Sequence, residues 1–226
     1  MNNDNEWKIV FLIILVLSLQ LVGYILFPNK AKAADSSIYI DSVGSNNTII
    51  ISQDGTEHLA AVSVGATLPT NSNDLKTGYG IGTRNYLGSG SSDYNYVSIS
   101  QQGLGFKTST VEIPNGANNN ITLYQDGLGN HTAAIQNLQG NNNAISVSQD
   151  GSGNHTFNVI NGTGTANSNN NVTGVQTGSG DKSFTLNMNG TNGATVSVQQ
   201  TNPTQANSGS MSIQCTTCGS YSYTRQ

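Results

Sequence analysis

Two stretches in the middle of the chain have nearly the same sequence. Residues 119–135 read NNITLYQDGLGNHTAAI, and residues 143–159 read NAISVSQDGSGNHTFNV. Their glutamines, Gln125 and Gln149, lie 149 − 125 = 24 residues apart. A fixed period of this length is typical of a repeat architecture, in which each unit packs only against its neighbours. The stretch from Asn119 to Ile160 therefore defines the repeat unit most clearly.

Each unit contains two short alternating segments separated by turn residues. Before Gln125, Ile121 and Leu123 alternate with polar residues, which predicts a strand with one buried face. The Asp-Gly that follows is a strong turn dipeptide, because Gly tolerates positive φ. Ala133 and Ile135 then form a second alternation, and the Asn/Gly-rich run at 140–143 closes the unit. The unit reads as strand, turn, strand, turn.

The unit recurs six times, with glutamine spacings of 48, 24, 24, 27 and 24. The glutamines are Gln53, Gln101, Gln125, Gln149, Gln176 and Gln200. Asparagines open the first strand at Asn47, Asn95, Asn119, Asn143 and Asn170, and turn glycines follow at Gly55, Gly103, Gly127, Gly151 and Gly178. The doubled first gap leaves residues 65–93 as either a degenerate coil or an insertion that loops out. The spacing of 27 places a three-residue insertion within 161–171.

One such unit is too small to bury its own apolar face. Stacking the units in register, about 4.8 Å apart, solves this and aligns equivalent positions in columns. We therefore predict an all-β fold, a β-solenoid of about six stacked strand–turn–strand coils. The glutamines would form one amide ladder and the asparagines another, hydrogen-bonded along the axis as in cross-β structures. Charged residues are only 9% of the chain and hydrophobic residues 35%, and a low hydrophobicity would usually suggest disorder, but the regular alternation argues against it.

The N-terminus has the pattern of an export signal. Residues 9–27 are almost wholly apolar, and the small-x-small triplet Ala31-Lys32-Ala33 follows. This predicts a signal helix at 1–33, cut after Ala33, with an uncleaved membrane anchor as the alternative. The remaining chain would be secreted, extracellular or at the cell surface, and would contact a membrane only through the signal segment. It would have no basic patch, which argues against a nucleic-acid partner.

The predicted order of the other segments follows from the repeats. Residues 34–46 form an N-terminal strand or cap, with a strand at Ile38–Ile40, and residues 47–64 form the first repeat. Residues 65–93 are the Gly/Ser/Tyr-rich insertion or degenerate coil, residues 94–213 hold five repeats, and residues 214–226 are a tail with Cys215 and Cys218. In an exported chain this pair predicts a disulfide, because a zinc site needs about four ligands.

At these residues the chain resembles the curlin repeat of bacterial curli. That pattern is Ser, five residues, Gln, one residue, Gly, two residues, Asn, one residue, Ala, three residues, Gln. The third copy matches it at Gln125, Gly127, Asn130 and Gln136, and the fourth at Gln149, Gly151 and Asn154. The resemblance covers residues 47–63 and 94–213. It departs where Asn replaces Ser at the strand start, where Thr132 and Thr156 replace Ala, and where the second strand's apolar residues lie one place later.

The resemblance implies a secreted structural protein that self-assembles end to end into extracellular curli-like amyloid fibres for adhesion and biofilm matrix. Its main partner would be itself, with a nucleator and a secretion channel as further implied partners. The alternative is a monomeric β-solenoid that binds a surface as an adhesin and does not polymerise. We predict no enzymatic activity and no cofactor, since no nucleophile, base and acid stand out together.

Several repeated polar residues have both a functional and a structural interpretation. His58, His131 and His155 occupy equivalent places after the turn, shared in other copies by Lys107 and Lys182. A metal-binding column is possible in principle, but a repeated polar residue at a turn explains them more simply, so no metal is predicted. Asp54, Asp126 and Asp150 suggest either Ca²⁺ or an Asx-type turn, and the turn is favoured. Tyr79, Tyr86, Tyr94 and Tyr96 could bind a ligand or cover the solenoid's flank.

Overall fold

In a computed structural model, the structure describes residues 36–226 except 43, 56–57, 66–91, 137 and 162–166. Within these ranges every regular element is a strand. The strands are β1 (Ser37–Ser42), β2 (Thr48–Gly55), β3 (Leu59–Val64), β4 (Tyr96–Gly103), β5 (Lys107–Ile113), β6 (Asn120–Asp126), β7 (His131–Gln136), β8 (Ala144–Asp150), β9 (His155–Asn161), β10 (Asn171–Thr177), β11 (Lys182–Met188), β12 (Thr195–Gln200), β13 (Asn207–Ile213) and β14 (Ser220–Arg225). The predicted signal helix at 1–33 lies outside the described residues.

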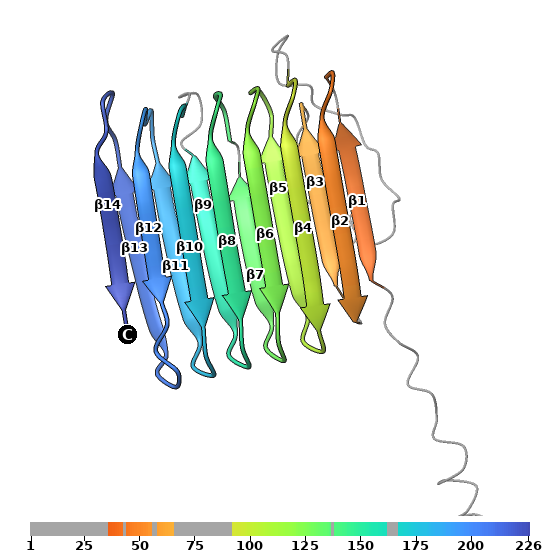
Figure 1. Cartoon of the computed structure of the whole chain (residues 1–226), viewed down its shortest axis with the longest axis vertical. Coiled ribbons are helices and arrows are strands. Elements are labelled where there is room, and N and C mark those ends of the chain that lie inside the picture. Colours follow the sequence, from red (N-terminus) through yellow and green to blue (C-terminus); the bar gives the residue numbers. More distant parts are fainter. Residues whose placement is uncertain (1–35, 43, 56–57, 66–91, 137, 162–166) are drawn as a thin grey trace, which may run out of the picture. The chain divides into compact units, whose positions relative to one another are not determined.

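The strands form two parallel sheets that face each other along the stack (Figure 1). The first sheet has the order β1-β3-β5-β7-β9-β11-β13, and the second has the order β2-β4-β6-β8-β10-β12-β14. Successive strands of the chain alternate between the sheets, so each pair from β2–β3 to β12–β13 makes one coil. The prediction of an all-β solenoid of about six coils is confirmed.

Equivalent repeat positions pair directly across the sheets. Gln125 pairs with Gln149, and Gln149 with Gln176, although the second pair spans the longer repeat. The extra length lies between the end of β9 and the start of β10, and does not shift the register. Strand β2 pairs with β4 and β3 with β5, so neither sheet has a rung between these strands. The two readings of residues 65–93 concern residues 66–91, which are outside the described part of the chain.

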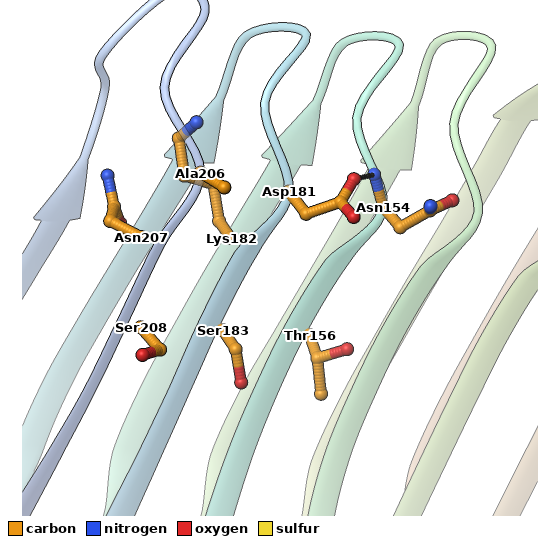
Figure 2. A pocket seen from close by; sticks show the side chains of 8 residues that line it. All are labelled: Asn154, Thr156, Asp181, Lys182, Ser183, Ala206, Asn207 and Ser208. Atoms are coloured by element: carbon orange, nitrogen blue, oxygen red, sulfur yellow. Dashed lines mark hydrogen bonds between the residues drawn. The ribbon is translucent and has the colours of Figure 1, made fainter.

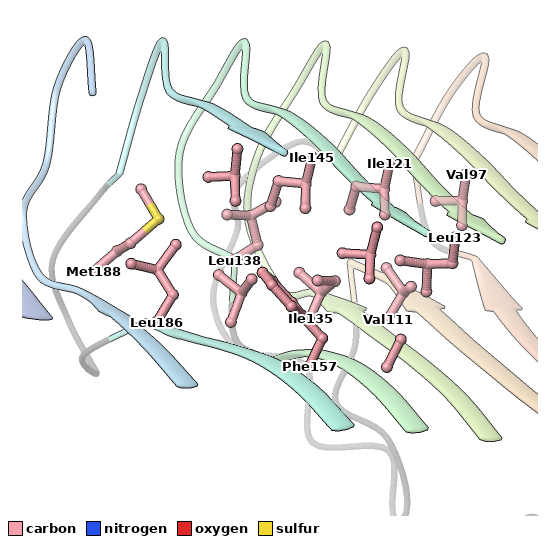
Figure 3. Close-up of a cluster of buried hydrophobic side chains, with 14 of the residues drawn as sticks. Val97, Val111, Ile121, Leu123, Ile135, Leu138, Ile145, Phe157, Leu186 and Met188 are labelled. Atoms are coloured by element: carbon pink, nitrogen blue, oxygen red, sulfur yellow. The ribbon is translucent and has the colours of Figure 1, made fainter. Parts of the chain in front are cut away.

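The inward side chains of both sheets form one continuous apolar core (Figure 3). Most core positions hold aliphatic residues, but one position holds a large aromatic ring that fits opposite a glycine of the other sheet. The Phe157 ring occupies the space that a side chain at Gly174 would need. Phe157 also stacks on Phe184, with ring centroids 5.7 Å apart. Large and small residues therefore interlock between the two sheets at this level of the stack.

A left-handed residue precedes the ladder asparagine in five coils. Asn46, Tyr94, Asn118, Asn142 and Asn169 all have φ between 56° and 58°. Asparagine tolerates this conformation better than most residues, which explains the repeated Asn-Asn pairs of the sequence. Gly193 takes the same place in the sixth coil, with a φ of 77°. The turn is thus built in the same way in every described coil.

Both ends of the described stack are formed by strands. The alternation at Ile38–Ile40 lies in β1, which extends the first sheet beyond β3. At the other end, β14 lies within the segment that the sequence suggested as a tail, and pairs in register with β12. The Cys215–Cys218 disulfide closes the turn that leads from β13 into β14. These terminal strands continue the solenoid rather than crossing over its ends.

Candidate functional site

The six glutamines form an unbroken amide ladder inside the stack. In the first five, Nε2 donates to the Oε1 of the next glutamine toward the C-terminus, over distances of 2.7–3.0 Å. Each Nε2 also donates to a backbone carbonyl of the opposite sheet, such as Thr108 O for Gln125 at 3.1 Å. All but Gln53 are fully buried. The ladder therefore links coil to coil and sheet to sheet.

The asparagines form a second ladder of opposite direction at the other edge of the sheets. The Oδ1 of Asn119 accepts from both the backbone N and the Nδ2 of Asn143, at 3.0 and 2.9 Å. The same pair of bonds joins Asn47 to Asn95, Asn95 to Asn119, and Asn143 to Asn170. The ladder ends where the backbone N of Ala194 donates to Asn170 Oδ1 at 2.8 Å. Donors in this ladder point toward the N-terminus of the stack.

The turn glycines are required by both conformation and spacing. The five predicted glycines have φ values from 89° to 130°. A Cβ on Gly127 would collide with the carbonyl oxygen of Gly151 in the next coil, and Gly103 and Gly151 are equally close to their own neighbours. Coils about 4.8 Å apart leave no room for a methyl group at this point of the turn. The glycines therefore set how closely the coils stack.

Histidines and lysines form a buried column beside the turns. His131 lies in register with Lys107 and His155, and His155 with Lys182. The rings of His131 and His155 stack with centroids 4.8 Å apart. All of these side chains are at most 1% exposed. The sequence placed them after the turn, but did not identify them as core residues.

This column holds the inward carbonyl groups of the turns. Lys107 Nζ donates to the carbonyl oxygens of Gly105, Gly127 and Gly129 at 3.1, 2.9 and 2.7 Å. His131 Nε2 lies 2.6 Å from Asp126 O, so a proton on Nε2 would donate to that carbonyl. The Nδ1 atoms of His58, His131 and His155 are buried without a hydrogen-bond partner. Neutral imidazoles with the proton on Nε2 fit this arrangement.

Burial keeps the histidines neutral. It lowers the pKa of His131 to about 4, and the neighbouring Lys107 ammonium adds to this effect. Burial also lowers the pKa of His58 and of His155. The pKa of Lys107 is lowered by burial too, while the carboxylates of Asp126 and Asp150 oppose that shift. Among the described residues, no three His, Cys, Asp or Glu side chains are grouped as a metal site would need.

The repeated aspartates serve the turns. Asp126 Oδ1 accepts from the backbone N of Gly127 at 2.6 Å, and its Oδ2 accepts from the Tyr124 hydroxyl at 3.0 Å. Asp150 lies next to Asp126 in register. Of the four candidate tyrosines, Tyr79 and Tyr86 lie outside the described residues. Tyr94 and Tyr96 are 60% and 37% exposed near the start of β4.

A shallow groove of about 480 Å³ crosses the outer face of the first sheet (Figure 2). Thr156, Ser183 and Ser208 lie along it in register, one from each of β9, β11 and β13. At its rim, Asp181 Oδ1 accepts from the backbone N of Asn154 at 2.9 Å. Besides these hydroxyl groups, the lining includes the amides of Asn154 and Asn207 and the side chains of Lys182 and Ala206.

The C-terminal end of the stack carries features that the sequence did not reveal. In β14, Arg225 occupies the register position of the ladder glutamines, opposite Gln200. Tyr223 lies over Gly209, where a side chain would collide with its ring, and its hydroxyl donates to Ser208 O at 3.0 Å. The ladders therefore do not continue into the last described strand. The sequence pattern that could have predicted β14 is its Tyr-Ser-Tyr alternation.

Among the described residues, the structure has no helix of the length and apolarity needed to cross a membrane. Comparison of the sequence and fold with protein-family models, curated proteins and solved structures finds no match.

Proposed function

We propose that this chain is a secreted structural subunit that assembles end to end into curli-like extracellular fibres. The observation that carries the proposal is the state of β1. Ile38 and Ile40 pair with Ala60 and Val62, whose side chains are fully buried in the core. Yet Ile38 is 51% exposed and Ile40 is 50% exposed, because no described strand lies beyond β1. Ile38 and Ile40 thus occupy core positions that a further strand, paired with β1, would bury.

The backbone at both ends supports the same proposal. Strands β1 and β2 are the edges of their sheets at one end, and β13 and β14 are the edges at the other. An edge strand offers N–H and C=O groups to any strand of matching register. Pairing would also bury the half-exposed core residues of the terminal rungs. Hydrogen bonding and apolar burial would thus act together in joining two copies.

The proposed export signal is compatible with this mode of assembly. Cleavage after Ala33 would leave only three residues before β1, which begins at Ser37. The mature chain would then start almost at its own edge strand. It would act outside the cell or at its surface, in adhesion or in a biofilm matrix. The proposal includes no catalytic role and no cofactor.

Export and assembly can be tested with the same material. Cells expressing the full sequence should release the chain into the medium, and N-terminal sequencing should begin at Ala34. The released chain should be unfolded in denaturant and then diluted into buffer. Fibres should then grow at a rate that depends on the concentration of the chain and that preformed seeds increase. A released chain that sedimentation shows to stay monomeric at every concentration would contradict the proposal.

A monomeric surface-binding solenoid is the second candidate, and the C-terminal end favours it. The ladders stop before β14, and the Tyr223 ring covers Gly209 at the end of the core. In that case the hydroxyl-lined groove of Figure 2 would be the binding face for a glycan or another hydroxylated surface. Substitution of Ser183 by Glu would then abolish binding to that surface, and unchanged binding would contradict this candidate.

A further inference from the structure

The two ends of the described stack are chemically different. At the N-terminal end, the inward side chains are Ile38 and Ile40 of β1 and Ile49 and Ile51 of β2. At the C-terminal end, the inward side chains include Met211 of β13 and Tyr221 and Tyr223 of β14. One end is aliphatic and β-branched, and the other is dominated by aromatic rings. Aromatic and β-branched side chains pair favourably on neighbouring strands.

The register within the chain predicts which residues would pair if a second copy continued the stack. The column that contains Val196 ends at Tyr221 in β14 and begins at Ile49 in β2. By the same rule Tyr223 would face Ile51, and Arg225 would face Gln53. In the other sheet, Met211 would face Ile40. All of these strands run in the same direction, so the junction would be a parallel pairing like those within the chain.

The glutamine ladder has a direction, and its ends are complementary. Every Nε2 in the ladder donates toward the C-terminus, so Gln53 Oε1 accepts no hydrogen bond from the described residues. At the other end, Arg225 stands in the glutamine position and is exposed. A guanidinium group offers only donors, and an amide oxygen is an acceptor. An acceptor at one end thus matches a donor at the other.

Contacts between like ends lack this match. In the ladder position, an N-terminal end offers only the Gln53 acceptor and a C-terminal end offers only the Arg225 donor, so two like ends cannot supply both halves of the hydrogen bond. We infer that copies of this chain join head to tail through one junction, in which Arg225 of one copy donates to Gln53 of the next. This inference rests on the proposed end-to-end assembly and adds its polarity and its contact residues.

Pyrene labels on the outer face of the terminal strands test the polarity. Ser52 of β2 and Thr224 of β14 are exposed and belong to the same register column. Chains carrying Ser52→Cys or Thr224→Cys are labelled without reduction, which preserves the Cys215–Cys218 disulfide. Fibres from an equal mixture of the two labelled chains should show excimer emission. Fibres from either labelled chain alone should show none.

The outcomes separate this inference from the proposal on which it rests. Excimer emission from fibres labelled at Ser52 alone, or at Thr224 alone, would overturn head-to-tail joining. Fibres without excimer emission in any mixture would overturn the in-register junction, while end-to-end assembly would stand. If even the unlabelled chain forms no fibres, both fail together.

The Arg225 contact has its own test, with a matched control. Arg225→Gln keeps a donor in the ladder position and should elongate seeds at nearly the original rate. Arg225→Glu places acceptors opposite Gln53 and should slow elongation roughly tenfold, the loss expected for one hydrogen bond. Equal elongation by both variants, each with its β14 protected from hydrogen exchange, would overturn this contact.

Discussion

Gln149 donates from Nε2 to Oε1 of Gln176 at 2.8 Å, although 27 residues separate the two. Gln125 and Gln149, which are 24 residues apart, make the same bond at the same distance. The ladder therefore fixes the register of the coils independently of loop length. A loop tolerates extra residues at little entropic cost, whereas a shifted rung would leave buried amides without partners.

The first prediction concerns these buried amides. Gln125→Ala combined with Gln149→Ala should destabilise the fold by roughly 1–3 kcal/mol per substitution, because each removal leaves a buried neighbour unsatisfied. It should also slow or abolish fibre growth. Gln199→Ala is the matched control, since Gln199 lies on the exposed face of β12. Denaturant unfolding and seeded growth measure the two effects, and unchanged growth in the double variant would remove the ladder from the mechanism.

The second prediction separates two reasons for glycine in the turns. Gly127→Ala should be strongly destabilising, because it combines a positive φ with a collision against Gly151. Gly193→Ala keeps the positive φ but meets nothing within 4 Å, so it should lose only about 1–2 kcal/mol. Gly219 has neither constraint and should tolerate Ala. Thermal unfolding that ranks the three variants in any other order would contradict the role assigned to coil spacing.

The third prediction is a loss of stability in acid. The pKa of His131 is lowered in the folded chain to about 4, so the unfolded chain binds protons more readily. Stability is therefore full above the ordinary histidine pKa of about 6.5 and falls as the pH drops toward 4. His131 alone would account for roughly 2–4 kcal/mol over this window. Unfolding should be followed from pH 7.5 to 4.

Substitution of the histidines provides the control for that measurement. His131→Gln with His155→Gln should lower stability at neutral pH and flatten its dependence on pH. The lysines of the column, Lys107 and Lys182, remain in place in this variant. An unaltered pH profile would show that the carboxylates, and not the buried column, determine the sensitivity to acid.

The fourth prediction concerns the packing of Phe157 on Gly174. Gly174→Ala should destabilise the fold, since its Cβ would collide with the Phe157 ring. Phe157→Leu alone should also destabilise it, by leaving a cavity. The double variant should recover part of the loss, because the smaller side chain makes room for the methyl group. Additive losses in a double-mutant cycle would show that the two residues do not interlock.

Much of this architecture could be predicted because the repeat makes the register visible in the sequence. Equal spacing of Gln101, Gln125 and Gln149 implies stacked coils, and period-two alternation implies which residues face inward. Parity alone would also have placed His131 in the core, since it stands six residues after Gln125, an even number, as do the inward Ala133 and Ile135. Because histidine is polar, the sequence is instead interpreted as placing it at an exposed position after the turn.

Other features do not follow from repetition. Tyr223 matches Gly209 across the two sheets, and that contact depends on three-dimensional size complementarity at an end of the stack. Strand β14 lacks the Gln and Gly of the repeat, so only its short tyrosine alternation marked it. The direction of the amide ladder also requires the orientation of side chains, which no spacing between residues contains.

The most direct test of end-to-end assembly is the axial periodicity of the assembled fibres. Each sheet of the described chain holds seven strands, so one copy should add seven rungs of about 4.8 Å, or about 34 Å, to a continuous stack. Cryo-electron microscopy with fibre diffraction should show a meridional reflection near 4.8 Å and a subunit rise near 34 Å, with β14 of one copy beside β2 of the next. Fibres whose copies associate through the outer faces of the sheets, or a chain that remains monomeric, would contradict it.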